Sequence, residues 1–229
     1  MKKLFLSLFI VASLCFNLRA DEGMWIPMLL QNNEQEMQEM GMNITAEDIY
    51  SINHSSMKDA VVLFDGGCTG EIVSNQGLLL TNHHCGFDWI QYHSTVEHDY
   101  LTHGFWAMSK EEELPCPGIS AVMLKSMEDV TDRVLEGVTK ETSNDERAEI
   151  VTANIERIKE EAEANSDYQV VIKSFYHGNK YYMIYNEVFK DVRMVGAPPS
   201  NIGKFGGDTD NWVWPRHTGD FSVFRIYVS

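Results

Sequence analysis

The chain has 229 residues, a net charge of −16 at pH 7 and 44% hydrophobic residues. This length suits one large domain or two small ones. Because nucleic acids and anionic lipid surfaces bind basic proteins, the strong negative charge argues against both as partners, and we expect neither a nucleic-acid partner nor a membrane partner.

Residues 1–20 have the three-part layout of a secretory signal peptide. A basic start is followed by the apolar residues 4–16, and Ala20 is a small residue suited to cleavage. The apolar stretch is too short to span a bilayer comfortably. We therefore expect an exported protein, in the periplasm or at the cell surface, with residues 21–229 as the mature part.

The predicted elements begin with a polar, partly helical segment at residues 21–56. Three short strands follow, separated by glycine-containing turns. They are expected at residues 61–64, 68–73 and 78–82. Because the third strand is a continuous apolar run, we expect it to be buried on both faces and to present residues 83–85 in a loop.

A helical interlude is expected at residues 128–166, where Ser143 and Glu146 have the spacing of a capping box. Val151, Ile155, Ile158 and Ala162 fall on one helical face, which favours a helix packed on its own domain. Strands then return at residues 168–176, 180–189, 191–195 and 220–228, and the first two form a hairpin. The pattern predicts a mainly β fold. Because the last strand would end unpaired, we also expect a truncated chain.

Two histidines and a cysteine follow the third strand, and three interpretations compete for them. A metal site would use His83, His84 and Cys85 with His93 and His98. Zinc ligands are usually spaced so that their side chains converge, whereas adjacent side chains at a strand end point in different directions. The sequence therefore does not favour a metal site. A second interpretation is two polar residues that end a strand and have no catalytic role.

The third interpretation is a general base beside a disulfide. Cys68 and Cys85 would lie on adjacent strands, and a bridge closing about 17 residues would contribute about 3 kcal/mol. The bridge would also fix the neighbouring His84, which a general base requires. Such a base needs an orienting carboxylate. The candidates are Asp208, Asp210 and Asp220. Asp208 and Asp210 fit ordinary turn residues of a glycine-rich loop. Asp220 opens an apolar strand, where a carboxylate can be held partly desolvated against an imidazole. Taken alone, Asp220 is also read as a turn residue, and it gains weight only in combination with the histidine motif.

No serine of the chain has the sequence context of a catalytic nucleophile. Ser200 follows two prolines and Ser222 lies inside a predicted strand, so both are poor candidates. Cys116, between two prolines, is the alternative nucleophile, although a structural thiol is the favoured interpretation.

Two longer motifs carry a family resemblance. Residues 68–85, CTGEIVSNQGLLLTNHHC, resemble the hairpin that holds the catalytic histidine of chymotrypsin-like serine peptidases, and GDFSVFRIY resembles their strand that begins with aspartate. More specifically, TNHHCGF and GGDTDNWVWPRHTGDFSVFRIY are similar to the bacterial dipeptidyl-peptidases 7 and 11, which are exported serine exopeptidases that remove dipeptides from peptide N-termini. The resemblance covers nearly all of residues 21–229.

This resemblance implies a chymotrypsin-like double β-barrel interrupted by a helical domain. Residues 21–229 would be the N-terminal part of that trypsin-like peptidase domain, comprising the first barrel and a helical interlude, and truncated before the second barrel is complete. His84 matches the general base and Asp220 its orienting acid, while Asn211 and Trp212 match residues that bind the free N-terminus of a peptide substrate.

The resemblance also implies that the serine lies beyond this chain, so that the chain alone is inactive. We therefore expect peptide substrates and no cofactor. A homodimer of the full-length parent is compatible with the resemblance. One alternative is an HtrA-like endopeptidase of the same fold, against which the motif at residues 206–220 argues. Another is a non-catalytic exported protein that binds a metal or a peptide.

Overall fold

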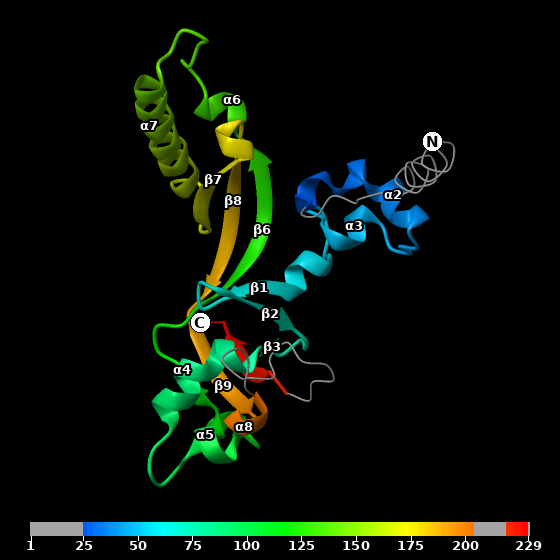
Figure 1. Ribbon diagram of the computed structural model, residues 1–229, viewed down its shortest axis with the longest axis vertical. Helices are drawn as coiled ribbons and strands as arrows, with labels where there is room; N and C mark the ends of the chain where they lie inside the picture. The colour runs from blue at the N-terminus through cyan, green and yellow to red at the C-terminus, as the bar shows by residue number, and fades with distance from the viewer. Residues whose placement is uncertain (1–24, 204–218, 229) are drawn as a thin grey trace, which may run out of the picture. The chain divides into compact units, whose positions relative to one another are not determined.

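The computed structural model describes residues 25–203 and 219–228, and Figure 1 follows the chain through them. The chain divides into two compact units, residues 1–46 and 47–229. The first unit contains the 3-10 helix η1 (Pro27–Asn32) and the helix α2 (Glu34–Glu39), and α3 (Ala46–Ile49) begins at the boundary. The predicted helical lead-in is thus confirmed. The predicted signal peptide lies outside the described residues.

The second unit is built on one antiparallel sheet, to which ten strands of the described residues belong. They are β1 (Val61–Phe64), β2 (Cys68–Ile72), β3 (Leu78–Thr81), β4 (Phe105–Trp106), β5 (Leu114–Pro115), β6 (Ala121–Asp129), β7 (Gln169–Phe175), β8 (Lys180–Phe189), β9 (Asp191–Ala197) and β10 (Ser222–Tyr227). The order across the sheet is β4-β9-β10-β3-β2-β1-β6-β8-β7, and β5 also pairs with β9. The predicted mainly β fold is confirmed.

The longest helix of the described residues packs on the last two strands in this order, β8 and β7. Helix α7 (Asn144–Glu163) begins at the predicted capping box, where Ser143 and Glu146 exchange hydrogen bonds. It buries Val151 and Ile158 against β7 and β8, and Figure 1 shows α7 lying along these strands. The other helices of this unit are η2 (Met57–Ala60), α4 (His83–His93), α5 (Tyr100–His103), η3 (Lys110–Glu112), α6 (Thr131–Val134), η4 (Tyr176–Gly178) and α8 (Ser200–Gly203).

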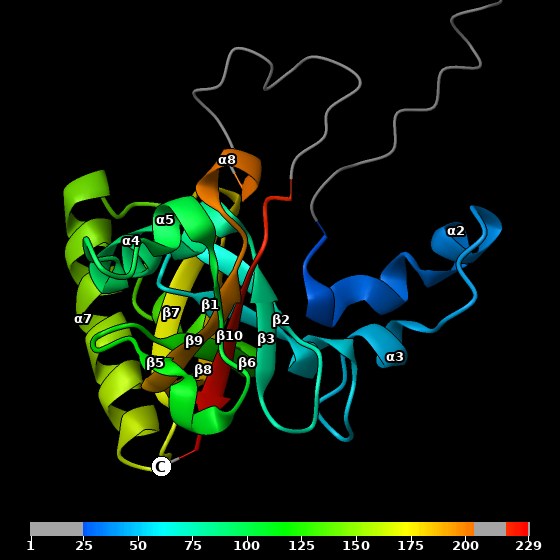
Figure 2. The same cartoon turned by 90° about the horizontal axis from the view of Figure 1, so that it is seen from below.

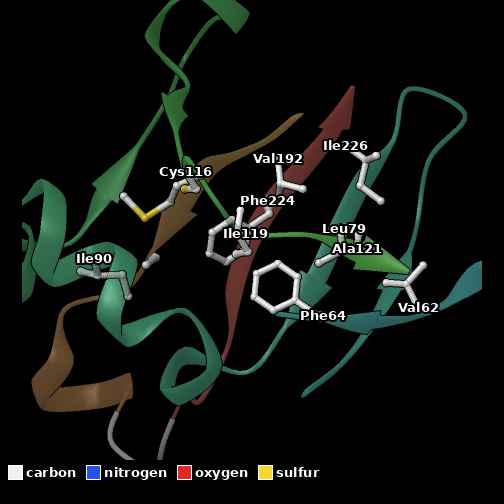
Figure 3. Packing of buried hydrophobic residues seen from close by; sticks show 12 residues of the cluster. Val62, Phe64, Leu79, Ile90, Cys116, Ile119, Ala121, Val192, Phe224 and Ile226 are labelled. Carbon is white, nitrogen blue, oxygen red and sulfur yellow. The ribbon is translucent and has the colours of Figure 1, made fainter. Parts of the chain in front are cut away.

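The main hydrophobic core lies inside the curve of the sheet (Figure 3). The rings of Phe64 on β1 and Phe224 on β10 pack with centroids 4.7 Å apart, and both side chains are fully buried. Burial of each ring contributes about 1.5–3 kcal/mol to stability. The core also contains Val62, Leu79, Ile90, Cys116, Ile119, Ala121, Val192, Met194, Ala197 and Ile226. Strands far apart in the sheet order meet in this core, which requires the sheet to curl around it.

The strand β3 differs from its prediction in two ways. Leu79 is fully buried but Leu80 is 36% exposed, so the strand has one buried face and not two. This is the usual state of an antiparallel sheet with one face on the core. The strand also runs directly into α4, so residues 83–85 begin a helix and not a loop.

The helices α4, α5 and α8 gather at one end of the sheet (Figure 2). This is the end at which the chain enters β10 and leaves β3. Among the helices of residues 25–203 and 219–228, none combines the length and the apolar character needed to cross a membrane.

Candidate active site

The pairing of β3 with β10 brings together the two halves of the candidate site. Thr81 pairs with Ser222 in an antiparallel register, so the residues after Thr81 run past the residues before Ser222. His84 and Asp220, 136 residues apart in the sequence, therefore meet just beyond the end of the ladder. The strand pairing, and not either residue alone, creates the site.

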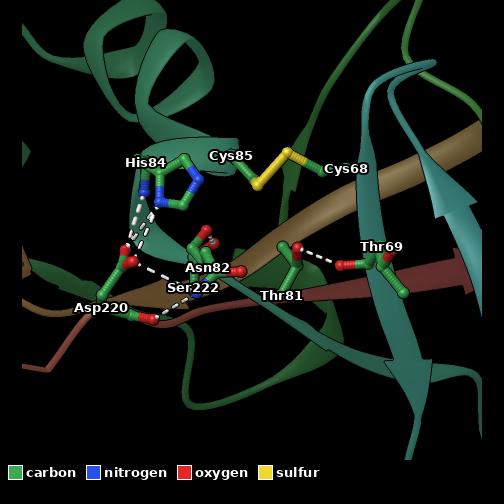
Figure 4. Close-up of a disulfide and its surroundings, with 8 residues drawn as sticks. All are labelled: Cys68, Thr69, Thr81, Asn82, His84, Cys85, Asp220 and Ser222. Atoms are coloured by element: carbon green, nitrogen blue, oxygen red, sulfur yellow. Dashed lines mark hydrogen bonds and ion pairs between the residues drawn. A yellow bond between two sulfur atoms is a disulfide. The ribbon is translucent and has the colours of Figure 1, made fainter. Parts of the chain in front are cut away.

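The Asp220 carboxylate holds His84 by both its ring and its backbone (Figure 4). His84 Nδ1 lies 2.9 Å from Asp220 Oδ2, and the His84 backbone N–H donates to Oδ1 at 3.1 Å. The Asp220 side chain is 13% exposed and that of His84 is 42% exposed. The predicted contact is present. With Nδ1–H donating to the carboxylate, Nε2 is the ring nitrogen that can accept a proton.

Asn82 is a third member of the site that the sequence did not suggest. Its side-chain amide donates to the backbone carbonyl and to Oδ2 of Asp220, both at 3.2 Å. Asn82 occupies the N-cap position of α4 but makes no capping hydrogen bond with its own side chain. Asp220, just before the neighbouring strand β10, supplies the cap instead, since its carboxylate accepts the His84 backbone N–H in the first turn, where negative charge is favourable.

A glycine sets how closely α4 approaches β10. A Cβ atom on Gly86 would lie 2.7 Å from Ser222 Oγ and 3.0 Å from the Phe224 ring. A side chain there would push α4 away from the strand. The Ser222 hydroxyl is itself fully buried and donates to the backbone carbonyl of Asn82 at 2.7 Å, so it has a structural role.

The predicted disulfide between Cys68 and Cys85 is confirmed, with Cα atoms 6.1 Å apart. Its setting was predicted wrongly, because Cys85 lies in the first turn of α4 and not on a strand. The bridge therefore ties the start of β2 to the helix turn that carries His84.

Removing this disulfide is expected to destabilise the fold by about 3 kcal/mol, because the bridge shortens the unfolded chain across 17 residues. The variant Cys68→Ala/Cys85→Ala should show this loss in urea denaturation followed by circular dichroism. Wild-type protein reduced with a thiol is the control and should lose a similar amount. An unchanged midpoint in both samples would contradict the prediction.

His83, next to the candidate base, has a different environment. It is 2% exposed, and among the described residues its Nε2 has no hydrogen-bond partner. Burial lowers the pKa of His83, and the Asp220 charge and a hydrogen bond to the Pro198 backbone oppose this only in part. The ring packs against Gly203 of α8, where a Cβ atom would collide with it. His83 therefore fits a structural role as a neutral imidazole.

The buried state of His83 predicts a loss of stability in acid. Because its pKa is lowered in the folded state, the unfolded chain binds a proton that the folded chain does not. Stability is expected to fall as the pH drops below about 6.5, the pKa of an unperturbed histidine. His83→Gln should flatten this dependence in urea denaturation at pH 5 and pH 7. A His98→Ala control, which changes an exposed histidine, should keep the wild-type slope.

Cys116, the alternative nucleophile, is placed unfavourably for that role. Its side chain is 2% exposed and belongs to the main core. Burial raises the pKa of its thiol to about 12, so the reactive thiolate is scarcely populated near neutral pH. The structure favours the structural interpretation of this thiol.

The residues predicted to bind a peptide N-terminus, Asn211 and Trp212, lie outside the described residues, as do Asp208 and Asp210. The two ends of this segment are held together, since the Gly219 N–H donates to the Ile202 carbonyl at 2.8 Å. Asp220 follows directly. The described residues on either side of this segment therefore lie next to the site, with Gly203 against His83 and Gly219 directly before Asp220.

Comparison with known proteins gives one consistent result. An Asp/Glu-specific dipeptidyl-peptidase of Flavobacterium psychrophilum is 55% identical over 229 residues, which is 99% of this chain and 31% of the relative. Dipeptidyl-peptidase 7 of Capnocytophaga gingivalis is 50% identical over 92% of this chain and 30% of its own length. This chain thus spans about a third of the curated relatives it matches.

The solved structures agree with these relatives. The crystal structure of Porphyromonas endodontalis DPP11 superimposes with a TM-score of 0.79 at 49% identity, over 91% of this chain and 30% of that one. The same protein in complex with the dipeptide Arg-Glu gives a TM-score of 0.78 at 50% identity, over 91% and 32% of the two chains. A family model described as Peptidase S46 matches residues 20–229. The chain therefore belongs to the Peptidase S46 family.

Proposed function

We propose that the full-length protein containing this chain is a serine-type dipeptidyl-peptidase that releases dipeptides from the N-termini of peptides. The observation that carries this proposal is the contact of His84 Nδ1 with Asp220 Oδ2 at 2.9 Å, on a helix turn held by a disulfide. The proposal is supported by relatives that carry dipeptidyl-peptidase names at 50–55% identity.

In the proposed mechanism, His84 is the general base and Asp220 orients it. Asp220 accepts the Nδ1 proton, which directs the basic lone pair of the imidazole to Nε2. His84 then takes the proton of a serine hydroxyl as the hydroxyl attacks the peptide carbonyl, and later gives the proton to the leaving amine. We place the serine in the part of the relatives that this chain does not span, so residues 21–229 alone should release no dipeptide.

We also propose that the protein is exported. The signal-like segment at residues 1–20 supports this, as does the disulfide, since such bonds persist mainly in oxidising compartments. A homodimer of the full-length parent stays a prediction.

The restriction to dipeptides is proposed to come from recognition of the free amine of the substrate. The Asn211 side-chain carbonyl can accept a proton from an ammonium group. The face of Trp212 can attract the same cation by about 0.5–2 kcal/mol. The family resemblance supports these two roles.

The test compares free and N-acetylated peptides as substrates of the full-length protein. Acetylation removes the positive charge, so it should abolish cleavage, and Asn211→Ala or Trp212→Ala should lower kcat/KM for free peptides. Peptides with acidic and with aliphatic second residues should be assayed in parallel, because the relatives carry two different names. Equal cleavage of acetylated and free peptides would instead support an HtrA-like endopeptidase.

A further inference from the structure

The disulfide and the candidate base together form the one group of three metal-ligating residues found among the described residues. The sulfur atoms of Cys68 and Cys85 and a ring nitrogen of His84 lie within 4.8 Å of one another. Figure 4 shows the His84 ring with Nδ1 toward Asp220 and with Nε2 on the side of the disulfide. In the disulfide form the sulfurs are bonded to each other, so they are not metal ligands.

We propose that reduction of this disulfide creates a zinc site, with Cys68, Cys85 and His84 as its protein ligands. A dithiol reductant supplies two electrons and two protons, breaks the S–S bond and is itself oxidised to a disulfide. Binding of Zn²⁺ then releases the two thiol protons, because thiolates are the ligands. A water molecule completes the tetrahedral set. The site goes beyond the proposed function and is formed only in the reduced protein.

The geometry suits this ligand set. Zinc bonds of about 2.3 Å to sulfur and about 2.0 Å to nitrogen, arranged tetrahedrally, separate ligand atoms by about 3.5–3.8 Å. The group already lies within 4.8 Å, so small side-chain rotations would bring its atoms to these separations. Two thiolates and an imidazole are ligands that zinc prefers. The metal site that the sequence analysis weighed and did not favour shares only His84 and Cys85 with this group.

Asp220 would act as the supporting group of such a site. A histidine that binds zinc through one ring nitrogen commonly donates its other N–H to a carboxylate, which fixes the ring. The 2.9 Å contact between His84 Nδ1 and Asp220 Oδ2 is already in place. The His84 side chain is 42% exposed, which gives an ion access from solvent.

A bound zinc ion would compete with the proposed catalytic role of His84. It would hold the imidazole nitrogen that the general base needs, so reduced protein would be inhibited by zinc and oxidised protein would not. This second statement rests on the proposed function, whereas zinc binding itself does not.

The experiment measures zinc binding by the full chain after reduction with a dithiol and removal of the reductant without oxygen. Competition with a chromophoric chelator should show one zinc per reduced chain and none per oxidised chain. His84→Ala should weaken binding by at least about 10-fold and Asp220→Asn by about 10–100-fold, the range for loss of a supporting group. His98→Ala and Cys116→Ala are the matched controls and should bind zinc as the wild type does.

A second measurement guards against binding by an unfolded chain. Circular dichroism should show that the reduced chain keeps its fold, and Co²⁺ in place of zinc should give thiolate-to-cobalt absorption that Cys68→Ser removes. Equal zinc affinity in wild type and His84→Ala, or a reduced chain that binds zinc only when unfolded, would overturn the site. If zinc binds the reduced full-length enzyme without inhibiting it, the site stands and the proposed role of His84 falls.

Discussion

Replacement of His84 with alanine in the full-length protein is expected to lower kcat for dipeptide release by about 10⁶-fold, the loss typical of removing a triad histidine. Without the imidazole, nothing at this position can take the proton of the attacking hydroxyl. Steady-state assays with a chromogenic dipeptide substrate measure the effect. His98→Ala, which changes an exposed histidine of the same unit, is the control and should keep full activity.

Asp220→Asn tests the orienting role separately and should lower kcat by about 10⁴-fold. An asparagine amide would donate to Nδ1 and place the imidazole proton on Nε2, where it blocks the base. The asparagine carbonyl can still accept the His84 backbone N–H that Asp220 Oδ1 now accepts at 3.1 Å, so the fold should be retained. Thermal melting checks this. A loss of activity smaller than 10-fold in both variants would refute the assignment of this pair.

The largest expected loss of stability comes from Glu113, which lies between η3 and β5 and contacts two residues of β10. Glu113 is 5% exposed, and its carboxylate accepts hydrogen bonds from Arg225 Nε and from the Tyr227 hydroxyl, both at 2.7 Å. Glu113→Ala leaves the Arg225 charge, which is only 14% exposed, without its carboxylate. Breaking a buried pair from one side destabilises a protein by about 3–5 kcal/mol. Urea denaturation of wild type and variant measures the difference.

The matched control for this variant is Glu136→Ala. Glu136 pairs with Arg157 at 3.1 Å, but its side chain is 73% exposed and that of Arg157 is 46% exposed. An exposed pair of this kind contributes about 0–1 kcal/mol. The prediction is therefore a difference between two glutamates in similar contacts. If Glu113→Ala lowers the free energy of unfolding no more than the control does, the prediction is wrong, and the Arg225 guanidinium is hydrated well enough without its carboxylate partner.

The sequence predicts elements whose signals are local. The capping box at Ser143 and the hairpin of β7 and β8 are read from neighbouring residues and are confirmed. The helix α4 was missed because an apolar strand runs into it with only Asn82 between them, so no turn signal marks its start. The strand β6 was missed because most of its residues are partly buried on both faces, which removes the alternation that identifies a strand.

The candidate site likewise has parts that local sequence signals predict and parts that depend on long-range contacts. The disulfide was predictable from residue types, but Asn82 was not, because its partner Asp220 lies 138 residues away. The pairing of His84 with Asp220 was predicted through a family resemblance, and only the register of β3 and β10 gives its physical cause. Residue types identify the candidates, whereas long-range strand pairing selects among them.

The hydrogen bond from the Gly219 N–H to the Ile202 carbonyl joins the two ends of residues 203–218 immediately before Asp220. Because this hydrogen bond ties Gly219 to α8, the position of the Asp220 carboxylate depends on α8 as well as on the pairing of β10 with β3. A substitution in α8 that moves the Ile202 carbonyl would therefore change how Asp220 holds the His84 ring without altering either of these two residues.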